Sequence, residues 1–113
     1  MPRNISFAMT TAQVIAREKT VTRRFGWDFI KPGDKLSGVK KAMGLKKGEK
    51  IERLCSIEVV SARWEPLNAI TQEDVIAEGF PDWTPQDFVD FIVGHYKCPP
   101  DKPINRIEFK YID

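Results

Sequence analysis

The segment from Ile51 to Trp64 most constrains what this 113-residue chain can fold into. Apolar and polar residues alternate along it, and a period of two is typical of a β-strand with one buried face. Pro66 ends the pattern, because proline interrupts the hydrogen bonds of a strand. The better core face is formed by every second residue: Cys55, Ile57, Val59 and Ser61.

Shorter segments predict the other elements of the fold. β-prone or alternating patterns predict strands over Arg3–Ala8, Thr20–Thr22, Lys35–Val39 and Ile104–Ile112. Apolar residues predict a helix over Ala12–Ala16, and apolar residues at helical spacing predict one from Thr84-Pro85 through His95. A variant of the capping box at Thr71–Asp74 predicts a short helix from Thr71 to Ala77.

Capping and turn residues support these boundaries. Thr10-Thr11, Thr71 and Thr84-Pro85 each offer a side chain that can cap the start of a helix. Gly79 is a typical residue for the end of the second helix. The sequence Lys31-Pro32-Gly33-Asp34 is typical of a type II turn before a strand.

The order of the elements decides the fold class. Strands and helices do not alternate one to one, so a parallel βαβ sheet is disfavoured. We therefore predict an α+β protein: a small, mostly antiparallel β-barrel with two or three short flanking helices. The length suits a single domain over residues 1–113.

Several classes of protein are not indicated by the sequence. No apolar run approaches the roughly 20 residues of a membrane span, and the first residues lack the apolar core of a secretory signal. Two cysteines, Cys55 and Cys98, do not make a disulfide framework, and one histidine without a Cys-x-x-Cys pair matches no familiar zinc pattern. We expect a reduced, cytoplasmic protein with no membrane contact, no metal and no cofactor.

The charge is distributed unevenly along the chain. Residues 1–53 carry thirteen Lys and Arg against five Asp and Glu, whereas residues 54–113 carry five against eleven. A basic face that binds polyanions is one interpretation. The other is that both halves interleave in the fold and give a mixed surface.

The densest polar cluster is Arg17–Arg24, where a helix is expected to give way to a strand. Within it, Lys19 and Thr22 are a candidate base and nucleophile. A threonine hydroxyl reacts only after a base takes its proton, and a lysine can act as that base only if its pKa is depressed. Burial or a neighbouring cation such as Arg24 lowers a lysine pKa. A solvated, basic strand start is the alternative.

Other candidate residues have equally simple alternatives. Glu78 lies at a helix end and can reach a pocket or remain in solvent. Lys46 and Lys47 belong to the lysine-rich segment Lys40–Lys50, which suits phosphate binding or an exposed loop. His95 is expected to be a partly buried or dipole-favoured side chain, Cys55 a small core residue, and Cys98 the more reactive thiol in a loop.

Two motifs give the chain a family resemblance. Lys19-Thr20-Val21-Thr22-Arg23-Arg24, followed by Lys31-Pro32-Gly33-Asp34, resembles the hallmark of the ASCH domain. That hallmark is a Gly-x-Lys-x-x-Thr-x-Arg stretch followed by a Pro-Gly-Asp turn into a strand. Ala77–Phe80 resembles the family's Glu-Gly-Phe segment, and Ile107-Glu108-Phe109 its closing strand. One departure is that Arg17 stands where the family has glycine.

The resemblance implies a fold and a chemistry. ASCH domains resemble the PUA superfamily, whose small β-barrel has helices beside a cleft suited to RNA or a nucleobase. Compact bacterial members are amidohydrolases that remove the acetyl group of N4-acetylcytidine with a Lys, a Thr and a Glu. By this resemblance the catalytic residues are Lys19, Thr22 and Glu78, and Arg24 matches the arginine of the motif.

Two functions follow as hypotheses. The first is an amidohydrolase that needs no metal and deacylates an N4-acylated cytidine-type nucleoside through Thr22 activated by Lys19. The second is a module that binds single-stranded RNA without deacylation, or that cleaves it as a ribonuclease. In that case Arg23, Arg24, Lys46 and Lys47 contact the nucleic acid. The oligomeric state and the natural acyl group do not follow from the sequence.

Overall fold

The structure, a computed structural model, describes residues 3–41, 47–48 and 50–113. The strands are β1 (Arg3–Ser6), β2 (Val21–Arg24), β3 (Lys35–Val39), β4 (Arg53–Pro66) and β5 (Pro103–Tyr111). The helices are α1 (Thr11–Ile15), the 3-10 turn η1 (Leu67–Ala69), α2 (Gln72–Ala77) and α3 (Pro85–Tyr96). No helix among the described residues has the length and apolar character needed to cross a membrane.

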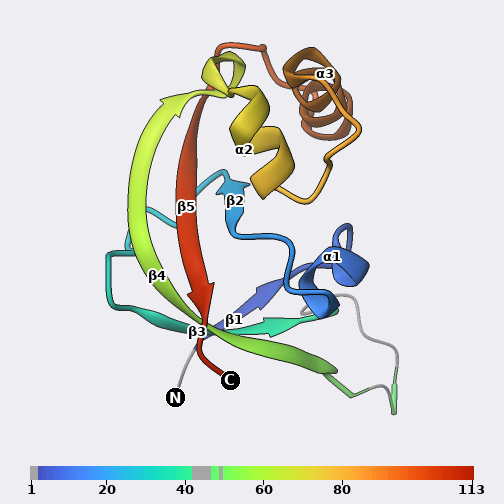
Figure 1. Cartoon of the computed structure of the whole chain (residues 1–113), viewed down its shortest axis with the longest axis vertical. Coiled ribbons are helices and arrows are strands. Elements are labelled where there is room, and N and C mark those ends of the chain that lie inside the picture. Colours follow the sequence, from blue (N-terminus) through green and yellow to red (C-terminus); the bar gives the residue numbers. More distant parts are fainter. Residues whose placement is uncertain (1–2, 42–46, 49) are drawn as a thin grey trace.

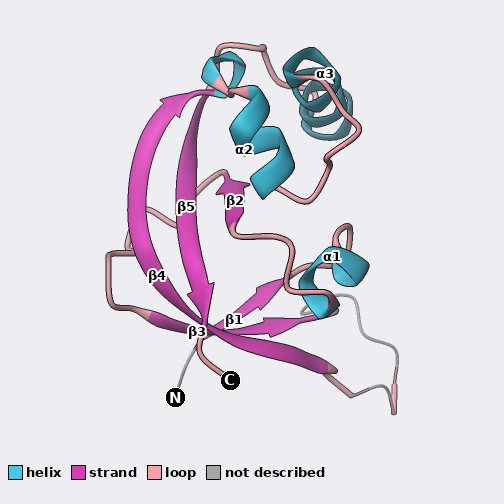
Figure 2. Cartoon of the chain, in the orientation of Figure 1, coloured by secondary structure: helices cyan, strands magenta, loops and turns pink. Residues whose placement is uncertain are grey.

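The strands form a curled sheet in the order β1-β3-β4-β5-β2 (Figure 1). β1 runs parallel to β3, and the remaining neighbours are antiparallel. Because β1 and β2 are the two edges of this sheet, the barrel stays open between them. Figure 2 shows α2 and α3 at one end of the long strands β4 and β5. The predicted α+β fold, a mostly antiparallel barrel with short helices, is confirmed.

β4 is the longest strand and follows the predicted alternation over its first half. Cys55, Ile57 and Val59 are buried, as expected. The register with β5 slips between Val59 and Ser61, so Val60 is an additional residue and is 45% exposed. Ser61, predicted on the core face, is consequently half-buried. Such a bulge bends a strand and strengthens its twist, which fits the curvature of β4.

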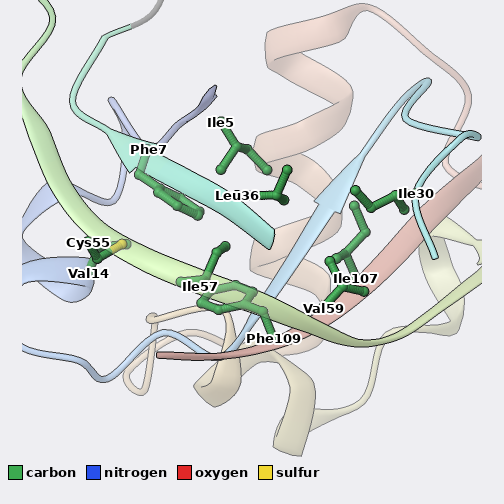
Figure 3. Close-up of a cluster of buried hydrophobic side chains, with 10 residues drawn as sticks. All are labelled: Ile5, Phe7, Val14, Ile30, Leu36, Cys55, Ile57, Val59, Ile107 and Phe109. Atoms are coloured by element: carbon green, nitrogen blue, oxygen red, sulfur yellow. The ribbon is translucent and has the colours of Figure 1, made fainter. Parts of the chain in front are cut away.

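The core has two parts. Side chains inside the curled sheet form the first, shown in Figure 3, which consists of Ile5, Phe7, Val14, Ile30, Leu36, Cys55, Ile57, Val59, Ile107 and Phe109. The second lies between the helices and the end of the sheet, and consists of Leu67, Ile70, Val75, Phe88, Val89, Ile92, Cys98 and Ile104. Cys98 lies in the loop after α3, as expected, but it is buried among these apolar side chains, and such burial does not favour the more reactive thiol expected there.

The caps of α2 and α3 form as predicted. Thr71 Oγ1 accepts a hydrogen bond from the Asp74 amide at the start of α2. Thr84 and Asp87 exchange hydrogen bonds at the start of α3, with Pro85 in the first turn. These reciprocal bonds satisfy amide groups that a helix cannot pair internally. Both helix starts are therefore set by local sequence.

The predicted cap of α1 is wrong. Thr10 has ψ of 32°, outside the extended region that suits a capping side chain, and its side chain makes no cap hydrogen bond. The neighbouring Thr11 hydroxyl donates instead to the Phe7 carbonyl oxygen at 2.9 Å. His95 is exposed in the last turn of α3, so it fits the dipole-favoured alternative and not the partly buried one.

Candidate active site

A cavity of about 210 Å³ lies between the two edge strands and the helices. Its lining comes from the end of β1, from β2, from the segment between β1 and α1, and from α3. Lys47 is exposed and does not line it, and Lys46 lies outside the described residues. The structure brings five of the sequence candidates to this cavity: Lys19, Thr22, Arg23, Arg24 and Glu78.

The turn before β2 positions Lys19. Arg17 has φ of 62°, the left-handed conformation that glycine adopts most easily, so the residue that replaces the motif's glycine keeps a glycine-like backbone. The Lys19 amide donates to the Gln13 carbonyl oxygen at 3.4 Å. The Arg17 guanidinium binds the Asp113 carboxylate and lies 4.9 Å from the centre of the Tyr111 ring. These contacts fix the turn through the arginine side chain.

The end of α2 positions Glu78 opposite this turn. Glu78 is the C-terminal cap residue of α2, and Gly79 follows with φ of 102°. A Cβ atom on Gly79 would lie 2.7 Å from Gln13 Cγ, so α1 and the end of α2 approach too closely for a side chain there. The Thr20 amide donates to the Ala77 carbonyl oxygen at 2.8 Å. Glycine is therefore required both by conformation and by contact.

Lys19 and Glu78 form a buried ion pair at the cavity wall. Lys19 Nζ lies 2.6 Å from Glu78 Oε1 and donates a second hydrogen bond to the Glu78 carbonyl oxygen at 2.8 Å. The two side chains are 3% and 4% exposed. Burial lowers the pKa of Lys19 below its ordinary value, although the Glu78 carboxylate opposes this effect. Arg24 and Arg23 lower the same pKa further.

Thr22 is held by Arg24 rather than by Lys19. Arg24 Nε donates to Thr22 Oγ1 at 3.0 Å, and Arg24 Nη2 donates to the Ser6 carbonyl oxygen at 2.6 Å, across the opening between β2 and β1. The Arg24 guanidinium also lies 5.4 Å from the centre of the Phe7 ring. Within the described part of the chain, the Thr22 hydroxyl proton has no acceptor. The threonine oxygen thus accepts a hydrogen bond from a cation.

Arg23 points away from solvent. Its side chain has no exposed surface and binds three carboxylates, with Nη1 3.3 Å from Glu78 Oε2 and Nη2 2.5 Å from Asp74 Oδ2 and 3.4 Å from Glu65 Oε2. Arg106 binds both oxygens of Asp74, at 2.7 and 3.0 Å. A guanidinium enclosed in this way has no surface to offer a phosphate.

The ion pairs also bear on the uneven charge of the chain. Arg17 pairs with Asp113, Lys19 with Glu78, and Arg23 with Asp74, so basic residues of the first half meet acidic residues of the second. The two halves interleave in these pairs, as the second interpretation of the charge distribution expects.

Aromatic side chains line the same cavity, among them Phe80, Phe91 and Tyr96. Phe80 stacks on Trp83 with ring centres 4.1 Å apart, and Phe91 packs 6.1 Å from Phe80. Tyr96 and Met9 line the cavity and are each half exposed. The helical spacing of the phenylalanines predicts only a packed face. That the same face closes a cavity depends on how α3 sits on the sheet, which sequence spacing does not reveal.

Sequence-based comparison gives no match, either with protein-family models or with curated proteins. Solved structures are similar to the whole chain. They include protein EF3133 from Enterococcus faecalis V583, with a TM-score of 0.69 and 18% identity over 100% of this chain and 77% of that one. An ASCH domain from Lactobacillus crispatus JV V101 has a TM-score of 0.73 and 13% identity, over 96% of this chain and 78% of that one. Hypothetical protein PH0355 has a TM-score of 0.64 and 14% identity, over 98% of this chain and 97% of that one.

These similarities extend over nearly all of the chain. At such low identity they establish the fold and do not transfer an activity. One of these structures is an ASCH domain, the family whose motifs the sequence resembles. The chain therefore has the fold of an ASCH domain.

Proposed function

We propose that this protein is an amidohydrolase that removes the acyl group from an N4-acylated cytidine-type nucleoside. The observation that carries the proposal is the meeting of Lys19, Glu78 and Thr22 at one cavity, with Arg24 bound to the threonine oxygen. Each group is of the type that acyl transfer needs: a base, an acid, a nucleophile and an oxyanion donor.

The shape and lining of the cavity suit a flat base. Phe80, Phe91 and Tyr96 supply aromatic side chains against which a pyrimidine ring can stack, in the same cavity as the charged groups. Stacking of this kind holds a nucleobase and leaves its exocyclic amide directed toward polar residues. The same side chains exclude water from Lys19 once a base is bound.

The buried ion pair can supply both a base and an acid. When substrate excludes water, charged groups lose hydration, so transfer of one proton from Lys19 Nζ to Glu78 Oε1 becomes less costly. The transfer runs along the 2.6 Å hydrogen bond and leaves a neutral amine beside a carboxylic acid. The lowered pKa of Lys19 favours the same direction.

Acyl transfer then uses the three groups in turn. The neutral Lys19 amine takes the Thr22 hydroxyl proton as the threonine oxygen bonds to the amide carbon. Arg24 stabilises the negative charge on the carbonyl oxygen. Glu78 donates its proton to the leaving exocyclic nitrogen, and the acyl group remains as an ester on Thr22. Lys19 and Glu78 are again an ion pair.

Water completes the cycle. The Glu78 carboxylate takes a proton from a water molecule as the water oxygen attacks the carbonyl carbon of the Thr22 ester. Lys19 returns a proton to the departing threonine oxygen, and a carboxylic acid is released. The proton that Glu78 took from water then passes to the neutral Lys19 amine along their hydrogen bond, which restores the ion pair. The products are the free amine and the acid.

The burial of Lys19 and Arg23 favours this function over RNA binding without turnover. Both side chains are paired with carboxylates and shielded from solvent, so neither is placed to contact a phosphate. A strand-binding surface would use exposed cations instead. RNA binding without turnover is therefore the competing function, and the experiment also measures RNA affinity.

The experiment measures release of cytidine from N4-acetylcytidine by chromatography, for wild type, Lys19→Arg and Thr22→Val. Both variants are expected to lose turnover, since arginine cannot be deprotonated and valine has no hydroxyl. Acid-quenched wild type should also carry one acetyl group by intact mass spectrometry, and Thr22→Val should not. Thr20→Val is the matched control, because Thr20 is exposed and does not line the cavity.

Absence of turnover by folded wild-type protein, together with RNA affinity retained by Lys19→Arg, would refute the amidohydrolase. The same RNA binding measurements would then support the binding module.

A further inference from the structure

A chain of buried charges continues from Glu78 away from the cavity. Arg23 links Glu78 to Asp74, and Arg106 holds Asp74 from the other side. The side chains of Arg23, Asp74 and Arg106 are 0%, 13% and 10% exposed. Asp74 and Arg106 are not among the residues that line the cavity. Neither is therefore placed to touch a substrate.

The arrangement brings two like charges together on one sheet. Arg23 of β2 lies directly opposite Arg106 of β5 in the strand register. Like charges at such positions repel and destabilise a sheet unless something separates them. Asp74 comes from α2 and binds both, with Oδ2 2.5 Å from Arg23 Nη2 and 2.7 Å from Arg106 Nε, and Oδ1 3.0 Å from Arg106 Nη2.

We propose that Asp74 and Arg106 are positioning residues that act through Arg23 to hold the Glu78 carboxylate in place for catalysis. This inference rests on the amidohydrolase proposed above. Each Glu78 oxygen has a different cation, Oε1 with Lys19 and Oε2 with Arg23. Arg23 can hold Oε2 only if its own guanidinium is fixed. Asp74 holds it at 2.5 Å, with Glu65 a longer contact at 3.4 Å.

The geometry also explains why an arginine occupies position 106. Two parallel hydrogen bonds to one carboxylate fix its orientation, which a single lysine ammonium cannot do. Charge and orientation can therefore be separated by substitution. Arg106→Gln removes both, and Arg106→Lys keeps the charge without the two-point contact.

The test combines two measurements on folded protein. The first is kcat and KM for N4-acetylcytidine. We expect Asp74→Asn, Arg106→Gln and Arg106→Lys each to lower kcat by roughly 10² with KM close to wild type, because the acid is misplaced while the aromatic side chains that bind the base are intact. The matched control is Lys110→Gln, which removes an exposed ion pair with Glu58 between β4 and β5.

The second measurement is the pH titration of the Lys19 Cε NMR signal, identified by its loss in Lys19→Arg. Besides Glu78 and Arg23, Arg24 also acts on this lysine. Asp74→Asn removes a negative charge from the network and should shift the midpoint down. Arg106→Gln removes a positive charge and should shift it up, and Arg106→Lys should leave it near wild type.

The outcomes separate this inference from the proposed function. Wild-type kcat in Arg106→Lys and Asp74→Asn would show that both residues serve stability alone, and would overturn the positioning role. If wild type has no turnover, the proposed function fails and the titration decides. Unchanged Lys19 midpoints in Asp74→Asn and Arg106→Gln would then overturn the coupling, and opposite shifts would support it.

Discussion

Replacing Glu78 by glutamine is expected to destabilise the fold strongly at neutral pH. The substitution preserves size but removes the charge 2.6 Å from Lys19 Nζ. Among the described residues, Lys19 has no other carboxylate within ion-pair distance, so a buried ammonium is left with only neutral hydrogen-bond partners. Removing one partner of a buried pair costs about 3–5 kcal/mol of unfolding free energy. Urea denaturation at pH 7 measures this difference directly.

The loss should depend on pH in a defined direction. Without Glu78 the pKa of Lys19 falls further below its unfolded value of 10.5, since the largest effect on it, burial, already lowers it. The folded variant then binds fewer protons than the unfolded chain, and its stability rises with pH up to that value. The difference from wild type should therefore shrink between pH 7 and pH 10.

A second substitution tests whether the unpaired Lys19 ammonium causes this loss of stability. Adding Lys19→Met to Glu78→Gln removes the buried ammonium, so the double variant should be more stable than Glu78→Gln alone at pH 7. An unfolding free energy of Glu78→Gln within about 1 kcal/mol of wild type at pH 7 would contradict this expectation. A loss of stability that does not change with pH would contradict it as well, and so would a double variant no more stable than Glu78→Gln.

Three further predictions concern the residues around the site. Gly79→Ala should lower stability by about 1–3 kcal/mol in thermal denaturation, because it combines a φ of 102° with a contact of 2.7 Å to Gln13. Arg17→Gly should change stability by less than about 1 kcal/mol, because relief of the left-handed backbone offsets the exposed pair with Asp113. Asp74 has a pKa of about 2 against an ordinary 3.8, chiefly through its hydrogen bonds to Arg106, so its pairing stabilises the fold above pH 4 and is lost as the pH falls toward 2. Acid denaturation of Asp74→Asn should therefore lack about 2 kcal/mol of the wild-type pH dependence over that range.

Local patterns were sufficient to predict most of the elements. The alternation along β4 and the caps of α2 and α3 depend on neighbours within a few residues, so sequence contains their causes. The bulge at Val60 does not, because it is a property of the pairing between β4 and β5. The cap at Thr10 also failed, because the backbone there does not take the extended conformation that a capping side chain needs.

The site residues also differ in whether local sequence or a long-range contact brings them together. Lys19, Thr22 and Arg24 lie within six residues, and their motif indicates a shared role. Glu78 joins them through the contact between α1 and the end of α2, where Gly79 leaves room for Gln13. No spacing rule predicts that meeting, and the family resemblance supplied it.

Asp74 shows why the remaining part of the site could not be predicted. In the sequence it is the third residue of a helix that begins after Thr71, and an acidic side chain there is fully explained by the helix start. Its amide does serve the cap, but its carboxylate is occupied by Arg23 and Arg106, which are opposite each other on β2 and β5. One residue thus meets a local and a long-range requirement at once. The local explanation is complete in itself, so it conceals the charge network that fixes Glu78.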